Sequence, residues 1–300
     1  MRTLSLSSLT VLPCSPLEQI DAAHAAGFDA VGLRLNPALP TDIDVMADAS
    51  LRRAIERRIS STGVRVLDVD VIRVGPETVV SATGPLLEYA GRLGAQNIVF
   101  TSLPRDRCRS CDEQSLASKV AELCDLAGRY GIRPIVEFVP FRGIGSLTDA
   151  LRLGERVNHP NFGICVDALH HHRSGGLPVE LADMNPLLLA SIQLCDAPQR
   201  APADLPAESR YNRLYPGEGE LPLVELLAAA PPDVPVSVEV PNAEERSRSP
   251  LERARKAAGC ARHILSVAEA RRRGKANAVG DQGGELAGVT SSAEGRRRLP

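Results

Sequence analysis

The feature that most constrains the fold is an oxygen-bearing side chain at the end of each of four short apolar segments. Glu137 lies in RPIVEFVP, Asp167 ends GICVD, Gln193 lies in SIQLCD and Glu239 lies in VSVEVP. The segments read as buried strands, and a charge buried there needs a partner. The four side chains are therefore predicted to share one site.

The spacing of these four residues indicates how the strands are arranged. Successive members are 30, 26 and 46 residues apart, and one strand, loop, helix and return loop takes about 30 residues. Each side chain thus falls on a different consecutive strand. In a closed parallel barrel the carboxyl ends of the strands meet at one mouth, so residues distant in the sequence can share a site.

The whole chain alternates strand-like and helix-like segments. Eight apolar strand patterns, the first over residues 4–12, alternate with amphipathic helix patterns, several of which end at a glycine. We predict the α/β class, with a single (β/α)8 TIM barrel over residues 1–272. Residues 273–300 are rich in Gly, Ser and Ala without apolar periodicity, and are predicted to form a disordered tail.

Composition excludes several classes of protein. The formal net charge of −2 gives no basic footprint, so no nucleic-acid partner is expected. No segment approaches 18 consecutive apolar residues, so we expect no membrane span and a cytoplasmic protein. The seven cysteines lie mostly in apolar contexts, typical of a reducing compartment. Cys108 and Cys111 form a C-x-x-C that lacks the second pair of a structural zinc site.

The predicted site has the composition of a metal centre. Two glutamates, an aspartate and an amide form a hard-ligand set, and no lysine or arginine stands directly beside the carboxylates. We predict one divalent ion, Mn²⁺ first, with Mg²⁺, Co²⁺ or Zn²⁺ as alternatives. Such an ion can polarise a ketone while a carboxylate removes the adjacent proton. Arg34 ends the second predicted strand. It is expected to be either a solvated residue or a substrate contact.

Five segments in this order, PIVEF, CVDALHHHRSG, IQLCD, RLYPGEGELPL and VSVEV, resemble the xylose isomerase-like TIM barrels over roughly residues 1–268. That family includes tagatose/psicose 3-epimerases, inosose isomerases and dehydratases, and relatives of endonuclease IV. The resemblance implies that four residues are metal ligands, and that the two glutamates among them are also the catalytic acid and base: Glu137, Asp167, Gln193 and Glu239. It further implies that His170 and Arg213 contact the substrate. The family usually has histidine where Gln193 stands, a change that favours harder ions.

The leading hypothesis for function is a metal-dependent isomerase or epimerase that acts on a ketose or polyol-ketone through an enediolate. The alternative is a metal-dependent dehydratase of the inosose or 3-dehydroshikimate type. Two remote alternatives are a sugar-binding barrel without turnover and an endonuclease IV-like phosphodiesterase, which needs more histidines than His24 on the earlier strands. The partner is a small sugar or polyol-ketone, and the sequence leaves open whether the chain forms a homo-oligomer.

Overall fold

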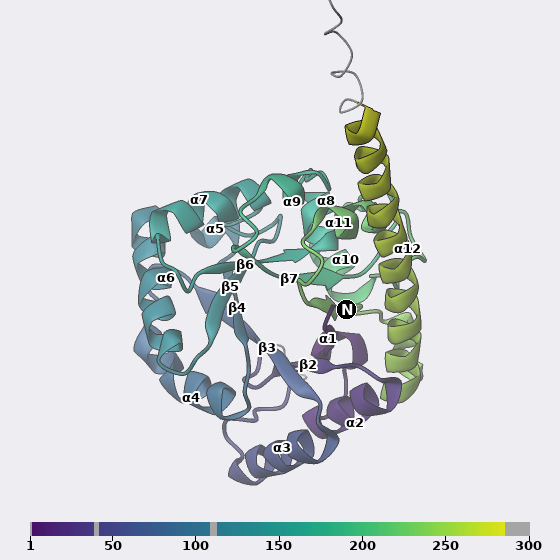
Figure 1. Cartoon of the computed structure of the whole chain (residues 1–300). Helices are drawn as coiled ribbons and strands as arrows, with labels where there is room; N and C mark the ends of the chain where they lie inside the picture. Colours follow the sequence, from purple (N-terminus) through teal and green to yellow (C-terminus); the bar gives the residue numbers. More distant parts are fainter. Residues whose placement is uncertain (1, 39–41, 109–112, 286–300) are drawn as a thin grey trace, which may run out of the picture.

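The barrel is closed by eight parallel strands that follow one another in the order of the sequence (Figure 1). The computed structural model describes residues 2–38, 42–108 and 113–285. The strands are β1 (Leu4–Ser7), β2 (Ala30–Arg34), β3 (Arg65–Val74), β4 (Asn97–Ser102), β5 (Arg133–Glu137), β6 (Gly163–Asp167), β7 (Leu189–Leu194) and β8 (Val236–Val238). Because β8 pairs with β1, the sheet has no free edge. The predicted TIM barrel is confirmed.

Helices surround this sheet and connect its strands (Figure 1). The α-helices are α1 (Ser8–Val11), α2 (Pro16–Ala26), α3 (Ala49–Thr62), α4 (Gly84–Arg92), α5 (Arg105–Cys108), α6 (Glu113–Gly128), α7 (Leu147–Val157), α8 (Ala168–Arg173), α9 (Glu180–Asp183), α10 (Leu205–Tyr211), α11 (Leu223–Ala229) and α12 (Pro250–Glu285). Two 3₁₀ turns are η1 (Val80–Thr83) and η2 (Glu244–Ser247). Cys111 of the C-x-x-C pair lies outside the described residues.

Local sequence signals fix where the helices begin and end. In α2, the Ser15 hydroxyl accepts a hydrogen bond from the Glu18 backbone N–H, and the Glu18 carboxylate accepts one from the Ser15 N–H. This reciprocal pair satisfies two backbone donors that the first helical turn leaves free. Gly27 ends the helix at φ 73°, a conformation that favours glycine. Both boundaries agree with the sequence, in which Ser15-Pro16-Leu17-Glu18 predicts a capping box and Gly27 predicts the end of the helix.

The apolar residues form two separate clusters. The larger one lies between the outer face of the sheet and the helices, where every strand contributes buried aliphatic side chains. The smaller one, with Val99, Ile135 and Cys165 at its centre, fills the inside of the barrel. In a barrel of this kind the interior is a packed core, so the polar residues at the strand ends lie at its mouth.

Two local predictions were wrong. The first strand ends at Ser7 and not at residue 12, because the chain turns into α1. That turn lets the Thr10 hydroxyl donate to the Val238 carbonyl and accept from the Val240 N–H, at 2.8 Å in each case. The second error concerns residues 197–220, whose Pro-, Ala- and charge-rich sequence predicts a long loop. This segment contains a helix, α10, which Asp204 caps through a hydrogen bond from the Ala207 N–H.

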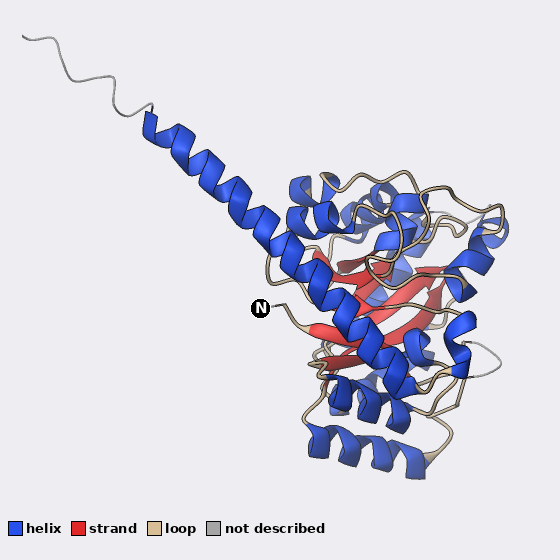
Figure 2. Cartoon of the chain, turned by 90° about the vertical axis from the view of Figure 1, so that its right-hand side faces the viewer, coloured by secondary structure: helices blue, strands red, loops and turns tan. Residues whose placement is uncertain are grey.

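The last helix is longer than predicted. α12 packs against α2 and α11 and runs to Glu285, beyond Arg272, where the sequence pattern ended (Figure 2). Extending an existing helix costs far less than starting one, so the residues after Arg272 can continue it without apolar periodicity. The predicted tail therefore begins as a helix, and residues 286–300 lie outside the described residues. No helix in the described ranges is both long enough and apolar enough to cross a bilayer.

Candidate metal centre at the barrel mouth

The carboxyl ends of β5 to β8 bring the four predicted ligands to one mouth. Glu137 and Asp167 are the last residues of β5 and β6, Gln193 is the second-to-last residue of β7, and Glu239 follows β8 directly. The strand register sets Asp167 beside Gln193 and Gln193 beside Ser237. The spacing argument therefore predicted the correct strand ends.

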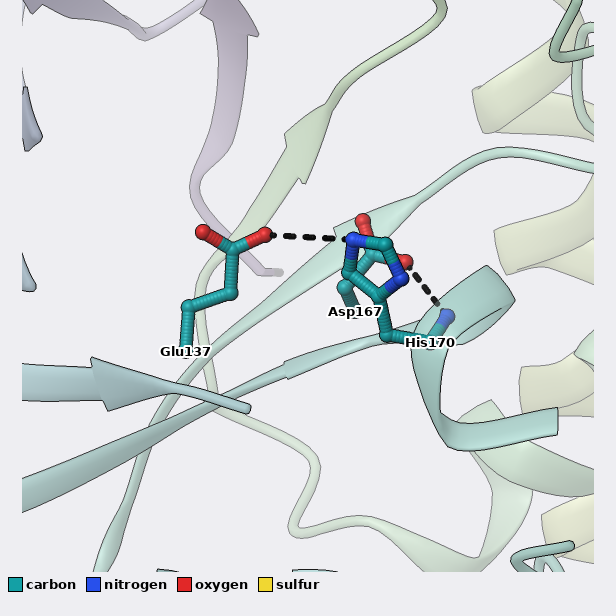
Figure 3. A group of neighbouring side chains, drawn as sticks. All are labelled: Glu137, Asp167 and His170. Atoms are coloured by element: carbon teal, nitrogen blue, oxygen red, sulfur yellow. Dashed lines mark hydrogen bonds and ion pairs between the residues drawn. The ribbon is translucent and has the colours of Figure 1, made fainter. Parts of the chain in front are cut away.

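Glu137, Asp167 and His170 form the group of His, Cys, Asp and Glu side chains, among the described residues, that could hold a metal ion (Figure 3). One ligand atom of each lies within 4.8 Å of the other two. Asp167 Oδ1 accepts the His170 backbone N–H at 2.9 Å, which starts α8 at this point. The His170 ring then faces Glu137, with Nε2 at 3.7 Å from Oε1. The structure thus groups His170, predicted only as a substrate contact, with two predicted ligands.

Gln193 and Glu239 contact each other directly. Gln193 Nε2 donates to Glu239 Oε1 at 3.3 Å, and the Ser7 hydroxyl donates to the same oxygen at 3.0 Å. Gln193 Oε1 is buried and has no hydrogen-bond partner among the described residues. An unsatisfied buried acceptor is costly, so this oxygen is available to a cation or a ligand donor. Carboxylates, an imidazole and a free amide oxygen are donors that fit a divalent ion.

Arg213 is a cation that the sequence analysis did not place among these carboxylates. Its side chain is buried, and Nη1 donates to Asp167 Oδ2 at 2.5 Å and lies 3.2 Å from Glu239 Oε2. Nε donates to the Ser209 carbonyl at 2.9 Å. Arg213 was expected only to contact substrate. The carboxylates were expected to lack a cationic partner, because no lysine or arginine stands directly beside them in the sequence. The guanidinium comes from the chain after α10, far away in the sequence.

Arg34 also lies in a buried ion-pair network. Nη2 donates to Asp70 Oδ2 at 2.8 Å, and Nη1 lies 3.3 Å from Asp42 Oδ2. The Arg34 side chain is only 9% exposed, so the solvated alternative is wrong. Because Arg34 lies beside the mouth, we still propose that it contacts the substrate.

A cavity of about 110 Å³ opens at this mouth. Predicted site residues that line it are Glu137, His170, Arg213, Glu239 and Arg34. Sequence reasoning missed Arg73, Thr101 and Arg142, which also line it. Arg73 and Thr101 lie near the carboxyl ends of β3 and β4, and that position is the signal that could have found them.

Burial perturbs the ionisation of the site. Burial, and then the neighbouring Glu239 and Asp167, raise the pKa of Glu137 well above its usual value. Burial raises the pKa of Glu239 to about 7, although Arg213 opposes the shift. Burial also lowers the pKa of His170 to about 4, which keeps the ring neutral at pH 7. A neutral imidazole can ligate a metal or accept a proton.

These shifts predict how the stability of the metal-free protein depends on pH. Between pH 4.5 and 6.5, Glu239 binds more protons when folded and His170 more when unfolded, so the two effects oppose each other. Above pH 6.5 the folded chain still holds protons on Glu137, Glu239 and Asp68 that the unfolded chain has already lost, and these three carboxyls outweigh the remaining titration of the unfolded imidazole. The free energy of unfolding should therefore fall from pH 6.5 to 8. Urea unfolding after chelation measures it, and Glu137→Gln should reduce the fall; equal stability at both values would contradict these pKa directions.

The chain is similar in sequence to two groups of curated enzymes, named 3-dehydroshikimate dehydratases and inosose isomerases. A 3-dehydroshikimate dehydratase from Pseudomonas putida is 26% identical over 234 residues, which cover 75% of this chain and 34% of that protein. An inosose isomerase from Bacillus velezensis is 24% identical over 240 residues, which cover 75% of this chain and 82% of that protein. The chain spans about a third of the length of the dehydratases that it matches.

Solved structures and a family model agree on the fold. The IolI protein, in a crystal structure with a binding zinc atom, aligns with a TM-score of 0.75 at 20% identity, over 88% of this chain and 98% of that one. The family model described as xylose isomerase-like TIM barrel matches residues 20–263. With most of its length matched in this way, the chain belongs to the xylose isomerase-like TIM barrel family.

Proposed function

We propose that the chain is a divalent-metal-dependent isomerase or epimerase that acts on a small polyol-ketone through an enediolate. The observation that carries this proposal is a pair of glutamates, Glu137 and Glu239, which line one cavity and whose pKa values are both raised. A general base works best when its pKa lies near the operating pH. The cavity volume of about 110 Å³ favours a single small molecule over an oligosaccharide.

The residues that would hold the ion are the predicted ligands Glu137, Asp167, Gln193 and Glu239, with His170 as a further donor. When bound, a divalent ion polarises the substrate carbonyl. The free Gln193 oxygen and the triad within 4.8 Å support this assignment. Mn²⁺ remains our first choice, because carboxylate and amide oxygens prefer hard ions.

The proton transfer uses the two glutamates in turn. One carboxylate takes the proton from the carbon beside the carbonyl, and the C–H electron pair forms the C=C bond of the enediolate. The other carboxyl then returns a proton to carbon, and the stereochemistry or the carbonyl position changes. The neutral His170 and the Arg213 guanidinium would bind substrate oxygens. Arg213 would also orient the Asp167 and Glu239 carboxylates through its ion pairs.

A metal-dependent dehydratase is the second candidate, and the 26% identity to a 3-dehydroshikimate dehydratase favours it. It would use the same base and the same enediolate. The steps diverge when a β-hydroxyl leaves with its bonding electrons and takes a proton, which creates a conjugated double bond and water. A general acid near the leaving oxygen is then required, a role open to the protonated member of the glutamate pair.

One experiment separates these functions. Protein loaded with Mn²⁺ is incubated in D₂O with ketohexoses and cyclic polyol-ketones, and followed by proton NMR and ultraviolet absorbance. Deuterium at the carbon beside the carbonyl without new absorbance would support the isomerase or epimerase. A new absorbance from a conjugated enone would support the dehydratase. Neither signal with any substrate would contradict both and favour a sugar-binding barrel.

The role of Gln193 is tested by Gln193→His. If Gln193 lies beside the ion, the imidazole should keep or strengthen metal binding, because it is a better donor than an amide oxygen. Isothermal titration with Mn²⁺ and Zn²⁺ measures the dissociation constants, with the exposed Gln199→His as control. Loss of metal binding in Gln193→His alone would place Gln193 away from the ion.

A further inference from the structure

The cavity has a second polar region, at the ends of β3 and β4, that the proton-transfer chemistry does not use. Arg73 on β3 is the strand partner of Thr101 on β4, and both line the cavity. The Thr101 residue is 4% exposed, and its hydroxyl has no hydrogen-bond partner within the described residues. A buried hydroxyl without a partner is costly, so this group points to a ligand atom.

Arg142 reaches the same region from the chain after β5. Its Nη1 donates to the carbonyl of Ser102, the residue next to Thr101, at 2.9 Å. The Ser102 hydroxyl in turn accepts the Ile144 N–H at 2.7 Å, which fastens this part of the chain to the end of β4. Arg142 also lines the cavity, so two guanidinium groups and a free hydroxyl border one side of it.

The charges of the cavity arginines differ in how they are balanced. Arg34 forms ion pairs with Asp70 and Asp42, and Arg213 pairs with Asp167 and Glu239. Arg73 is exposed, and its guanidinium donates from Nη2 to a backbone carbonyl, that of Ala38, at 3.1 Å. Among the described residues no carboxylate forms an ion pair with Arg73. Arginine binds carboxylate and phosphate groups through paired hydrogen bonds.

We propose that Arg73, Thr101 and Arg142 form an anion subsite, so that the substrate is a polyol-ketone that carries a carboxylate or phosphate group. This inference rests on the proposed function, because the ketone end of the same molecule lies at Glu137 and Glu239. The two regions share one small cavity, so the anionic group sits a few bonds from the reacting carbon. The subsite orients the substrate and rejects neutral sugars.

The test compares matched charged and neutral probes by isothermal titration of the metal-loaded protein. Shikimate and its neutral methyl ester form the carboxylate pair, and myo-inositol 1-phosphate and myo-inositol form the phosphate pair. We expect one charged probe to bind at least about tenfold more tightly than its neutral partner, and the pair that shows it identifies the group. Equal affinities within both pairs would overturn the proposal.

Variants locate the subsite. Arg73→Gln and Thr101→Val should each remove most of the preference for the charged probe and leave the affinity for the neutral probe unchanged. Arg65→Gln, an exposed arginine at the opposite end of β3, is the matched control and should change neither. If Arg210→Gln on α10 removed the preference and Arg73→Gln did not, the proposed location would be wrong.

The outcome stays separate from that of the proposed function. A charge preference that depends on Arg73, in a protein that shows no exchange with any ketone, would support the subsite and contradict the isomerase. Exchange with neutral ketones, in a protein that shows no preference for charged probes, would support the isomerase and contradict the subsite.

Discussion

Replacing Glu137 or Glu239 by glutamine should lower the rate of proton exchange beside the substrate carbonyl by about 10²- to 10⁴-fold, the usual contribution of a positioned acid or base. Glutamine keeps the size of the side chain but can neither accept the proton nor supply a carboxylate to the ion. Because both pKa values are raised by burial, a neutral amide should also be tolerated by the fold. Exchange measured by NMR in D₂O, under saturating Mn²⁺, gives the rates.

The control for this series is Glu122→Gln on α6, whose side chain is 50% exposed and lies outside the cavity. It should exchange at the rate of the unaltered protein. Metal content by elemental analysis accompanies each variant, so that loss of the ion and loss of the base are distinguished. A rate near that of the unaltered protein in either Glu137→Gln or Glu239→Gln would refute the two-glutamate mechanism.

Replacing Arg213 by methionine should lower the free energy of unfolding by about 3–5 kcal/mol, the usual cost of removing one partner from a buried ion pair. The substitution leaves Asp167 and Glu239 buried without the guanidinium that lies 2.5 Å and 3.2 Å from them. Urea unfolding of the chelated protein measures the loss. Arg213→Lys retains the charge and should lose less, and excess Mn²⁺ should restore part of the stability because a cation bound to the folded state stabilises it.

The matched control is Arg58→Met, which removes an ion pair with Asp21 between side chains that are 37% and 52% exposed. Exposed pairs contribute about 0–1 kcal/mol, so this variant should unfold close to the unaltered protein. Equal losses in Arg213→Met and Arg58→Met would show that Arg213 does not compensate the site carboxylates.

The fold could be predicted because its signals are local and repeated. Ser15 and Glu18 start α2, glycines end several helices, and the spacing from Glu137 to Asp167 matches one strand-helix unit. The errors lie where tertiary contacts decide. The Thr10 hydroxyl donates a hydrogen bond to the Val238 carbonyl of β8, and β1 therefore ends early. Val238 is more than 200 positions away, so the sequence around Thr10 does not indicate this contact.

The site could be predicted only in part for the same reason. Glu137, Asp167, Gln193 and Glu239 stand out because each is polar within an apolar strand. Arg213 lies in a polar stretch, where an arginine is unremarkable until the fold brings it to Asp167. Thr101 is the second-to-last residue of β4 and an ordinary β-branched strand residue. Only its position in the cavity and its hydroxyl, which has no partner among the described residues, distinguish it.

The closure between the two ends of the chain has a consequence for synthesis. β1 pairs with β8, Arg253 donates to the carbonyls of Val11 and Leu12, and Ser7 donates to Glu239 across 232 positions. None of these partners exists until the ribosome has made nearly the whole barrel, which takes roughly 12–50 s at about 5–20 residues per second. During that time the edge of β1 that later pairs with β8 is exposed, and chaperones or other nascent chains can bind to it.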